Sequence, residues 1–315
     1  MPGTWRLFDY TLRPSKHVER KMLAEAFTRL DHLAALDQWR YVGLGSLWFA
    51  DFSLFHRRLG FRLMHSIEEE DDPDLQKRFQ ANIPYETTLH FGTTTTQLPT
   101  IPWDDPTVVW LDYDSVLKPD VFDDITHVVS ACTLPTVLLI TLNVNSGKDV
   151  GRLDRFRNVI GADNVPDWVK SDADLGLGVD GMARAVRELV TNAVADVLTD
   201  RNAPEQDEDR VRYKQLFNFR YADGSQMLSV GGLLYRARDE GRVSECNFDT
   251  FPFVVGGSEP FVITVPLLTV RETLLLDARL PAMPDPAEFP GVEQDEIDAY
   301  ARLYRYLPVY VDADL

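Results

Sequence analysis

Cysteine is scarce in this sequence. The 315 residues include only Cys132 and Cys246, which lie far apart. A disulfide framework or a Cys-rich zinc site needs more cysteines at closer spacing. The sequence therefore argues against a small disulfide-stapled fold, and the cytoplasm is the expected compartment.

Long apolar runs are also missing. No stretch of 18 or more apolar residues occurs, and the N-terminal residues 1–16 lack a charged start followed by a continuous apolar segment. A transmembrane helix or a secretory signal would require one of these patterns. We therefore expect no membrane association.

Basic residues are in the minority, because 32 Lys and Arg stand against 50 Asp and Glu, a net charge of −18. A surface of this sign repels a phosphate backbone, so non-specific nucleic-acid binding is disfavoured. A local basic groove remains compatible with this balance, and the acidity also has a simpler interpretation as an aid to solubility.

Several catalytic motifs are absent from the sequence. It has no Gly-Lys-Ser/Thr phosphate loop and no His-Glu-x-x-His metal motif. Ser46 follows Gly45, but Trp48 stands where a hydrolase nucleophile elbow needs glycine. These absences disfavour a P-loop NTPase, a zinc protease of that type and an α/β-hydrolase.

What the sequence does contain is a regular alternation of helices and strands. Apolar residues at three- and four-residue spacing predict the helices, and β-branched apolar runs predict strands buried on both faces. Expected strands are 39–44, 61–67, 87–91, 107–111 and 136–143, and expected helices are 16–39, 47–59, 75–81, 119–131 and 181–198. A hairpin is expected from the runs 213–221 and 226–236 around residues 222–225. The pattern predicts an α/β fold with a doubly wound, mostly parallel sheet.

Changes in this pattern suggest three parts of the chain. Residues 1–38 form an N-terminal helical segment, and residues 39–236 form a Rossmann-like domain with a helical insertion at about 146–210. Residues 237–315 form a C-terminal α+β extension, whose aromatic stretches are candidates for contact with a protein partner.

Polar and glycine residues gather at the ends of the predicted strands. Gly43-x-Gly45-Ser46 follows the first strand, and Glu68 ends the second. Gly92-Thr93 ends the third and Asp112 the fourth. In an open parallel sheet these ends open into one crevice, where glycines admit a ligand and a carboxylate holds ribose hydroxyls. The sequence therefore predicts a nucleotide site.

This arrangement resembles class I methyltransferases that use S-adenosylmethionine. The resemblance covers about residues 38–236 and rests on residues 41–46, Glu68, Gly92-Thr93 and residues 111–114. The wider pattern is similar to bacterial methyltransferase-like proteins. The resemblance implies that Gly43 and Gly45, with Ser46, approach the cofactor, that Glu68 holds its ribose, and that Asp112 lies beside the transferred methyl. Two positions depart from the family pattern, Tyr41 for an acidic residue and Leu47 for a third glycine, and the signature of amino-group methylation is absent.

The pair Asp112-x-Asp114 allows several interpretations. Either carboxylate could take a proton from an acceptor hydroxyl, or both could bind a divalent cation. The same pair is also a signature of metal-dependent glycosyltransferases that use nucleotide sugars. Alternatively, Asp114 caps the following turn and only Asp112 lines the crevice.

Three further residues are candidates for binding the unidentified acceptor. Arg13 and Lys16 belong to a basic stripe with Arg20, and Asn143 ends the fifth strand. The stripe is equally explained as a solvated helix face, and Asn143 as a turn residue.

The leading hypothesis is an S-adenosylmethionine-dependent methyltransferase, with O-methyl transfer as its expected reaction. The alternatives are an inert Rossmann-like scaffold in a larger assembly, a metal-dependent glycosyltransferase, and a nicotinamide dehydrogenase, which the missing third glycine disfavours.

Overall fold

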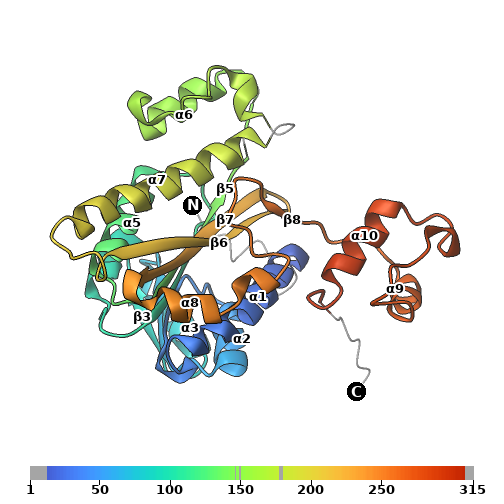
Figure 1. Ribbon diagram of the computed structural model, residues 1–315, viewed down its shortest axis with the longest axis horizontal. Coiled ribbons are helices and arrows are strands. Elements are labelled where there is room, and N and C mark those ends of the chain that lie inside the picture. Colours follow the sequence, from blue (N-terminus) through green and yellow to red (C-terminus); the bar gives the residue numbers. More distant parts are fainter. Residues whose placement is uncertain (1–12, 146, 149, 177–179, 309–315) are drawn as a thin grey trace.

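The protein is built around one mixed sheet (Figure 1). In the computed structural model, residues 13–145, 147–148, 150–176 and 180–308 are described. The strands lie in the order β3-β2-β1-β4-β5-β7-β6-β8, and β1 to β5 are parallel while β7 is antiparallel to its neighbours β5 and β6. The strands are β1 Arg40–Gly43, β2 Leu63–Glu68, β3 Thr87–Phe91, β4 Thr107–Asp112, β5 Thr136–Asn143, β6 Val211–Ala222, β7 Gln226–Arg236 and β8 Phe261–Ile263. The predicted Rossmann-like α/β fold, including the hairpin of β6 and β7, is confirmed.

Helices cover both faces of the sheet (Figure 1). On one face lie α1 Pro14–Phe27, α2 Ala50–Leu59, α3 Pro73–Asn82 and α8 Glu240–Glu245. On the other lie α4 Thr94–Gln97, α5 Pro119–Ala131 and α7 Gly181–Asn202, with α6 Arg152–Ile160 set outside α7. The C-terminal part carries α9 Val270–Asp277 and α10 Gln294–Leu303, which project from one end.

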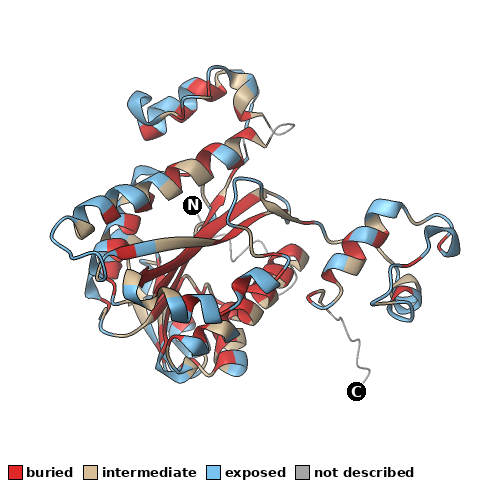
Figure 2. Ribbon diagram, in the orientation of Figure 1, coloured by how far each residue is buried: buried red, intermediate tan, exposed pale blue. Residues whose placement is uncertain are grey.

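Two cores follow from the alternation of side chains along each strand. In β4, Val108 and Trp110 pack with α1 and α2, whereas Val109 and Leu111 pack with α5 and α7. Successive side chains of a strand point to opposite faces, so a central strand covered by helices must be apolar throughout. Figure 2 shows the buried sheet between its helical layers.

Most predicted elements are found, and the differences have local causes. The helix expected over 16–39 stops at Phe27 and continues as a 3-10 turn, where the Thr28 hydroxyl bonds the Glu25 carbonyl at 2.6 Å. Helix α2 begins three residues later than expected because Ser46 and Phe49 have φ of 51° and 44°. It ends as predicted before Gly60, which has φ of 77°.

The C-terminal extension is joined to the main body. Strand β8 pairs with β6, and Leu303 and Tyr306 are buried in the core that contains α1. A separate small core in the C-terminal part contains four buried residues, Leu276, Phe289, Ile297 and Tyr300. The division at residues 38 and 236 stays a prediction.

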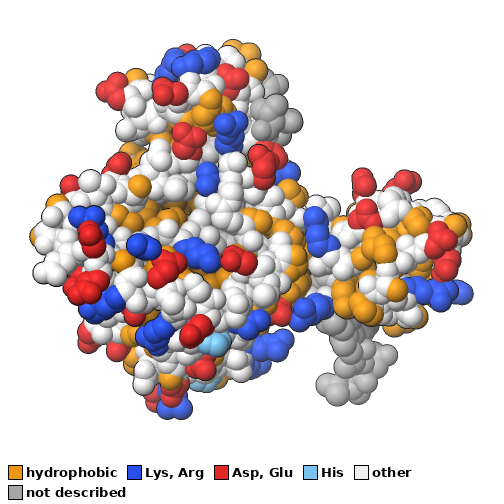
Figure 3. All heavy atoms as spheres, in the orientation of Figure 1, with side chains coloured by type: hydrophobic (Ala, Val, Ile, Leu, Met, Phe, Trp, Pro, Cys, Tyr) orange, Lys and Arg blue, Asp and Glu red, His pale blue; other side chains and the backbone are white. Residues whose placement is uncertain are grey.

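Charges of both signs are interspersed over the face seen in Figure 3. Among the described helices, none has both the length and the apolar character that a membrane span requires.

Candidate functional site

A cleft opens at the carboxyl ends of the parallel strands, which is the edge where ligands bind in open α/β sheets. Its volume is about 880 Å³, enough for a nucleoside-sized ligand. We call it the strand-end cleft. Its walls come from the segments that follow β1, β2, β3 and β4, and they include Arg20, Gly45, Ser46, Glu68, Gly92, Thr93, Thr94, Asp112, Tyr113 and Asp114.

Gly45 and Glu68 are joined through one buried hydroxyl. The Gly45 amide donates to Ser66 Oγ at 3.0 Å, and Ser66 Oγ donates to Glu68 Oε1 at 2.7 Å. Ser66 and Glu68 are two residues apart on β2, so their side chains point to the same face. A Cβ on residue 45 would lie 2.4 Å from the Phe49 ring and 2.8 Å from Ser66 Oγ. Glycine is therefore required here by close packing.

Burial raises the pKa of Glu68 to about 8, although the hydrogen bond from Ser66 and the backbone amide of Gly45 favour its carboxylate form. The side chain lies in the wall of the cleft and is only 7% exposed. The loss of hydration on burial, which favours the neutral acid, thus has a larger effect on this pKa than the hydrogen bonds that favour the carboxylate. Additional hydroxyl donors from a ligand would stabilise the charged form.

The opposite wall is fixed by a buried carboxylate on α5. Asp124 is fully buried, and its Oδ2 accepts hydrogen bonds from the Thr94 hydroxyl and, at 2.5 Å, from the Tyr113 hydroxyl. Thr94 and Tyr113 both line the cleft. The Gly92 amide donates to the Glu68 carbonyl at 3.0 Å, which ties this wall to the end of β2.

Asp112 borders the cleft above a buried charge network. Lys16 Nζ lies 2.8 Å from Asp112 Oδ1, 2.9 Å from Glu19 Oε2 and 3.1 Å from the Tyr221 hydroxyl. The side chains of Lys16 and Glu19 are 0% exposed, and that of Asp112 is 17% exposed. Burial alone would raise the pKa of Asp112, but Lys16, followed by Arg13 and Arg20, holds it below the ordinary value. Asp112 is therefore a charged carboxylate at neutral pH.

Seven of the eleven candidate site residues meet in the strand-end cleft, namely Gly45, Ser46, Glu68, Gly92, Thr93, Asp112 and Asp114. Arg20 of the basic stripe lines it as well. Gly43, Arg13, Lys16 and Asn143 do not line it. A Cβ on Gly43 would lie 2.6 Å from the Tyr41 hydroxyl, so this glycine makes room for Tyr41. Arg13 Nε is 3.9 Å from Asp223, and Asn143 Oδ1 accepts from the Asn145 amide at 2.8 Å, as a turn residue does.

Sequence reasoning missed Ser66, Asp124 and the burial of Lys16. The position of Ser66, two residues before Glu68 on a strand, was a usable signal. Asp124 lies within an amphipathic helix and carries no such signal. Across the described residues, no group of three or more His, Cys, Asp or Glu side chains could hold a metal ion.

Comparisons with known proteins place these observations in a family. A family model described as "Putative O-methyltransferase" matches residues 8–315. A search of curated proteins found no match.

A search of solved structures matches LepI and two methyltransferases, among others. LepI in complex with SAM is 12% identical, with 67% of this chain and 46% of LepI covered and a TM-score of 0.36. The arsenic(III) S-adenosylmethionine methyltransferase of Chlamydomonas reinhardtii is 10% identical, covering 64% of this chain and 65% of that one, with a TM-score of 0.37. The O-methyltransferase TomG of Streptomyces achromogenes is 18% identical, covering 68% and 88%, with a TM-score of 0.34. This chain thus spans less than half the length of LepI.

The family match extends over nearly the whole chain and agrees with the resemblance found in its strand-end residues. The protein belongs to this O-methyltransferase family.

Proposed function

We propose that the protein transfers a methyl group from S-adenosylmethionine to a hydroxyl oxygen of an acceptor, with the strand-end cleft as the cofactor site. The observation that carries this proposal is the joined pair Gly45 and Glu68 in the wall of one cleft. The family match favours methyl transfer over the glycosyltransferase and dehydrogenase alternatives.

The chemistry of the walls fits the cofactor. Glu68 would accept hydrogen bonds from the ribose hydroxyls, and the backbone at Gly45 and Ser46 would lie along the methionine part. Gly92 and Thr93 would contact the adenine edge. Each of these residues lines the cleft, and Gly45 has no room for a side chain.

S-adenosylmethionine supplies a methyl group on a positively charged sulfur: the acceptor's oxygen–carbon bond forms as the carbon–sulfur bond breaks, and that electron pair stays on sulfur. The protein must then align the acceptor and receive its hydroxyl proton. We assign the proton to the carboxylate of Asp112, which passes it to solvent through its exposed edge. Asp114, exposed at the cleft mouth, would add negative charge beside the sulfonium.

Two further proposals follow from the described residues. Cys132 and Cys246 are both buried and unpaired, which suits a reducing compartment such as the cytoplasm. Arg13 lies near Asp112 and Asp223, and its guanidinium would bind an oxygen of the acceptor. The buried Lys16 would not contact the acceptor but would fix the position and charge of Asp112 through their ion pair.

Titration calorimetry tests the cofactor site. We expect wild-type protein to bind S-adenosylmethionine and S-adenosylhomocysteine with micromolar Kd, and Glu68→Ala to lose at least tenfold in affinity. Glu86→Ala removes an exposed carboxylate that does not line the strand-end cleft and is the matched control. A folded protein that binds neither compound would instead indicate the inert scaffold, and manganese-dependent binding of a nucleoside diphosphate would indicate a glycosyltransferase.

A further inference from the structure

One buried arginine lies in the wall of an otherwise acidic cleft. Arg20 belongs to α1, is 8% exposed and lines the strand-end cleft. The other basic side chain among the described residues of the lining, Lys118, is exposed. Eight acidic side chains also line the cleft, namely Glu68, Glu69, Glu70, Asp71, Asp72, Asp112, Asp114 and Asp120. Most of the wall therefore repels an anionic group of a ligand, and Arg20 is the buried position that attracts one.

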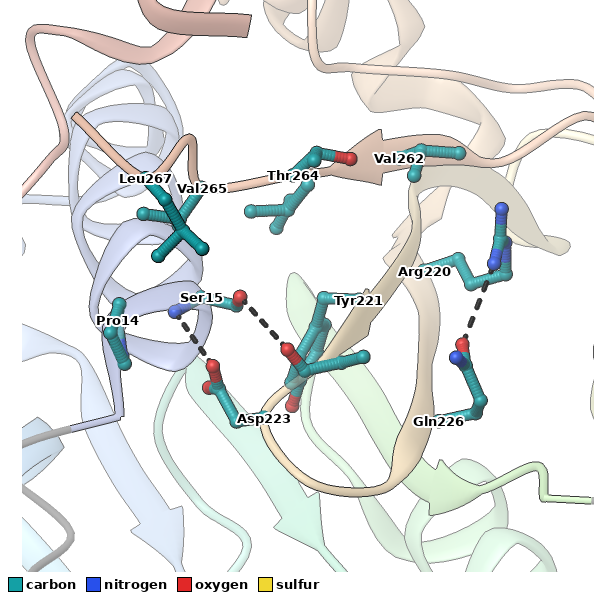
Figure 4. A pocket seen from close by; sticks show the side chains of 12 residues that line it. Pro14, Ser15, Arg220, Tyr221, Asp223, Gln226, Val262, Thr264, Val265 and Leu267 are labelled. Carbon is teal, nitrogen blue, oxygen red and sulfur yellow. Dashed lines mark hydrogen bonds between the residues drawn. The ribbon is translucent and has the colours of Figure 1, made fainter. Parts of the chain in front are cut away.

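Contacts at the start of α1 fix where Arg20 lies. Asp223 accepts hydrogen bonds from the backbone amides of Ser15 at 3.1 Å and Lys16 at 2.9 Å, which holds the first turn of α1 against the turn between β6 and β7 (Figure 4). Lys16 Nζ lies 2.8 Å from Asp112 Oδ1 at the end of β4. Residues four apart share one face of a helix, so Arg20 follows Lys16 about 6 Å further along the axis. Arg20 thus enters the cleft beside Asp112.

Two carboxylates of the protein act on this guanidinium. Asp112 and Asp51, which lies in the first turn of α2, both interact with Arg20 through their charges. Burial raises the pKa of Asp51, and the charge of Arg20 is the largest of the effects that oppose this rise. Asp51 is itself held by a hydrogen bond from the buried Tyr41 hydroxyl. Groups on α2, β1 and β4 therefore position Arg20 in the wall.

The charges of the proposed cofactor match this distribution. S-adenosylmethionine has two cationic groups, the sulfonium and the α-ammonium, and one anionic group, the α-carboxylate of its methionine part. The cationic groups fit the acidic wall, whereas the carboxylate needs a cation beside it. Gly45 and Ser46, along which the methionine part would lie, line the same cleft as Arg20. A guanidinium can donate two parallel hydrogen bonds to a carboxylate, which fixes its orientation as well as its place.

We propose that Arg20 binds the α-carboxylate of the cofactor, and that it selects an adenosyl compound that carries a complete amino acid. The pairing holds the methionine part between Arg20 and the segment Gly45-Ser46, with the sulfonium toward Asp112. Arg20 does not touch the reacting atoms, so it is a positioning and specificity residue. The identity of the ligand rests on the proposed methyl transfer.

Calorimetry with two nucleosides isolates the contribution of the carboxylate. S-adenosylhomocysteine is compared with its decarboxylated analogue, which keeps the adenosine, the thioether and the ammonium. The acidic wall favours the analogue, whose net charge is positive, so a preference for S-adenosylhomocysteine requires a cation at the carboxylate. A third ligand, 5′-methylthioadenosine, lacks the amino acid and reports whether the nucleoside part of the cleft is intact.

The variants are Arg20→Gln, Arg20→Lys and a matched control, Arg58→Gln, which removes an exposed guanidinium of α2 outside the cleft. We expect wild type and Arg58→Gln to bind S-adenosylhomocysteine at least about tenfold more tightly than the analogue, and Arg20→Gln to show less than about a twofold preference. Arg20→Lys keeps the charge without the two parallel donors, so its preference should be intermediate. The Kd of methylthioadenosine should be the same in all four proteins. If Arg20→Gln does not fold, wild type and Arg20→Lys still test the proposal.

Two results would overturn the assignment to Arg20. One is wild-type protein that binds S-adenosylhomocysteine and its decarboxylated analogue equally. The other is a preference that survives in Arg20→Gln, or that disappears in Lys118→Gln instead. Failure of the proposed function is a different result, because wild type would then bind neither S-adenosylhomocysteine nor methylthioadenosine.

Discussion

Lys16 and Asp112 form an ion pair of 2.8 Å beneath the floor of the strand-end cleft. The same ammonium lies 2.9 Å from Glu19 and 4.3 Å from the centre of the Trp110 ring. One buried ammonium therefore pairs with two carboxylates, and it keeps Asp112, the residue to which we assign the proton, in its charged form.

Lys16→Met should strongly destabilise the protein. It leaves Glu19 buried without its cation, and breaking a buried ion pair from one side costs about 3–5 kcal/mol. Urea unfolding followed by circular dichroism measures the loss. Lys77→Met, which removes an exposed partner of Asp74, should cost under about 1 kcal/mol. If the Lys16 variant were as stable as the Lys77 variant, the buried ion pairs of Lys16 would not stabilise the fold.

Cofactor binding should depend on pH through Glu68. Burial raises its pKa to about 8 in the free protein, and ribose hydroxyls that donate to the carboxylate should lower it. Binding is then coupled to proton release, so affinity should rise from pH 6 to about 8 and level off above. Calorimetry in two buffers of different ionisation enthalpy measures the released proton. Glu68→Gln should abolish the release, and Glu86→Gln, at an exposed carboxylate outside the cleft, should not. Proton uptake by wild type would contradict the assignment.

The same group should make the free protein less stable as pH rises. Its folded-state pKa of about 8 lies above its ordinary value of 4.5, so its contribution is complete below 4.5 and is lost as pH rises toward 8. Relative to Glu68→Gln, the unfolding free energy of wild type should fall by up to about 1.4 kcal/mol per pH unit in this window. Parallel urea titrations at pH 5, 6.5 and 8 test this, and a difference between the two proteins that stays constant would refute it.

Gly45→Ala should damage the cleft wall. Its Cβ would lie 2.4 Å from the Phe49 ring, and either the ring or Ser66 must move, which moves Glu68 with it. We expect a loss of about 1–3 kcal/mol in stability and at least a tenfold weaker affinity for S-adenosylmethionine. Gly241→Ala is the control, because a Cβ there meets nothing within 4 Å. Unchanged binding in Gly45→Ala would show that the Gly45–Ser66–Glu68 chain does not shape the site.

The strand-end cleft was predictable from the sequence because the carboxyl ends of neighbouring parallel strands lie at the same edge of the sheet, whichever side chains pack between the strands. Thr136–Asn143 was recognisable as a strand, since burial on both faces makes it apolar throughout. The surroundings of Lys16 were not predictable. Lys16 and Arg20 at four-residue spacing are typical of a solvated helix face, and only the contacts of α1 with β4 and β6 bury them.

Helix α6 lies within the predicted helical insertion but its bounds were not predicted, and helix α9 was missed, for opposite reasons. In α6, Leu153, Phe156 and Ile160 have helical spacing and are buried, so the signal was present within a polar segment. In α9 only Leu276 is buried, while Val270 and Leu274 are exposed, so its apolar residues did not mark a face that packs on the rest of the chain.

Asp124 provides a test of how the far wall of the cleft is positioned. It is fully buried on α5, and it accepts from the hydroxyls of Thr94 and Tyr113, two residues that line the strand-end cleft. Asp124→Ala leaves two hydroxyls without their acceptor, at a cost of about 1–3 kcal/mol in stability. It should also weaken S-adenosylmethionine binding about tenfold, because Thr94 and Tyr113 lose their fixed orientation.

The conservative variant separates positioning from simple packing. Asp124→Asn keeps an oxygen that can accept from both hydroxyls, so we expect it to restore most of the affinity lost in Asp124→Ala. Asp123→Ala, one residue earlier and exposed on the same helix, should bind like wild type. Calorimetry well below the unfolding temperature gives the three Kd values. The contrary outcome is an Asp124→Ala variant that is less stable yet binds S-adenosylmethionine as tightly as wild type. That outcome would show that Asp124 stabilises the fold but does not position Thr94 and Tyr113 for binding, because an unchanged Kd means that both residues keep their places in the cleft.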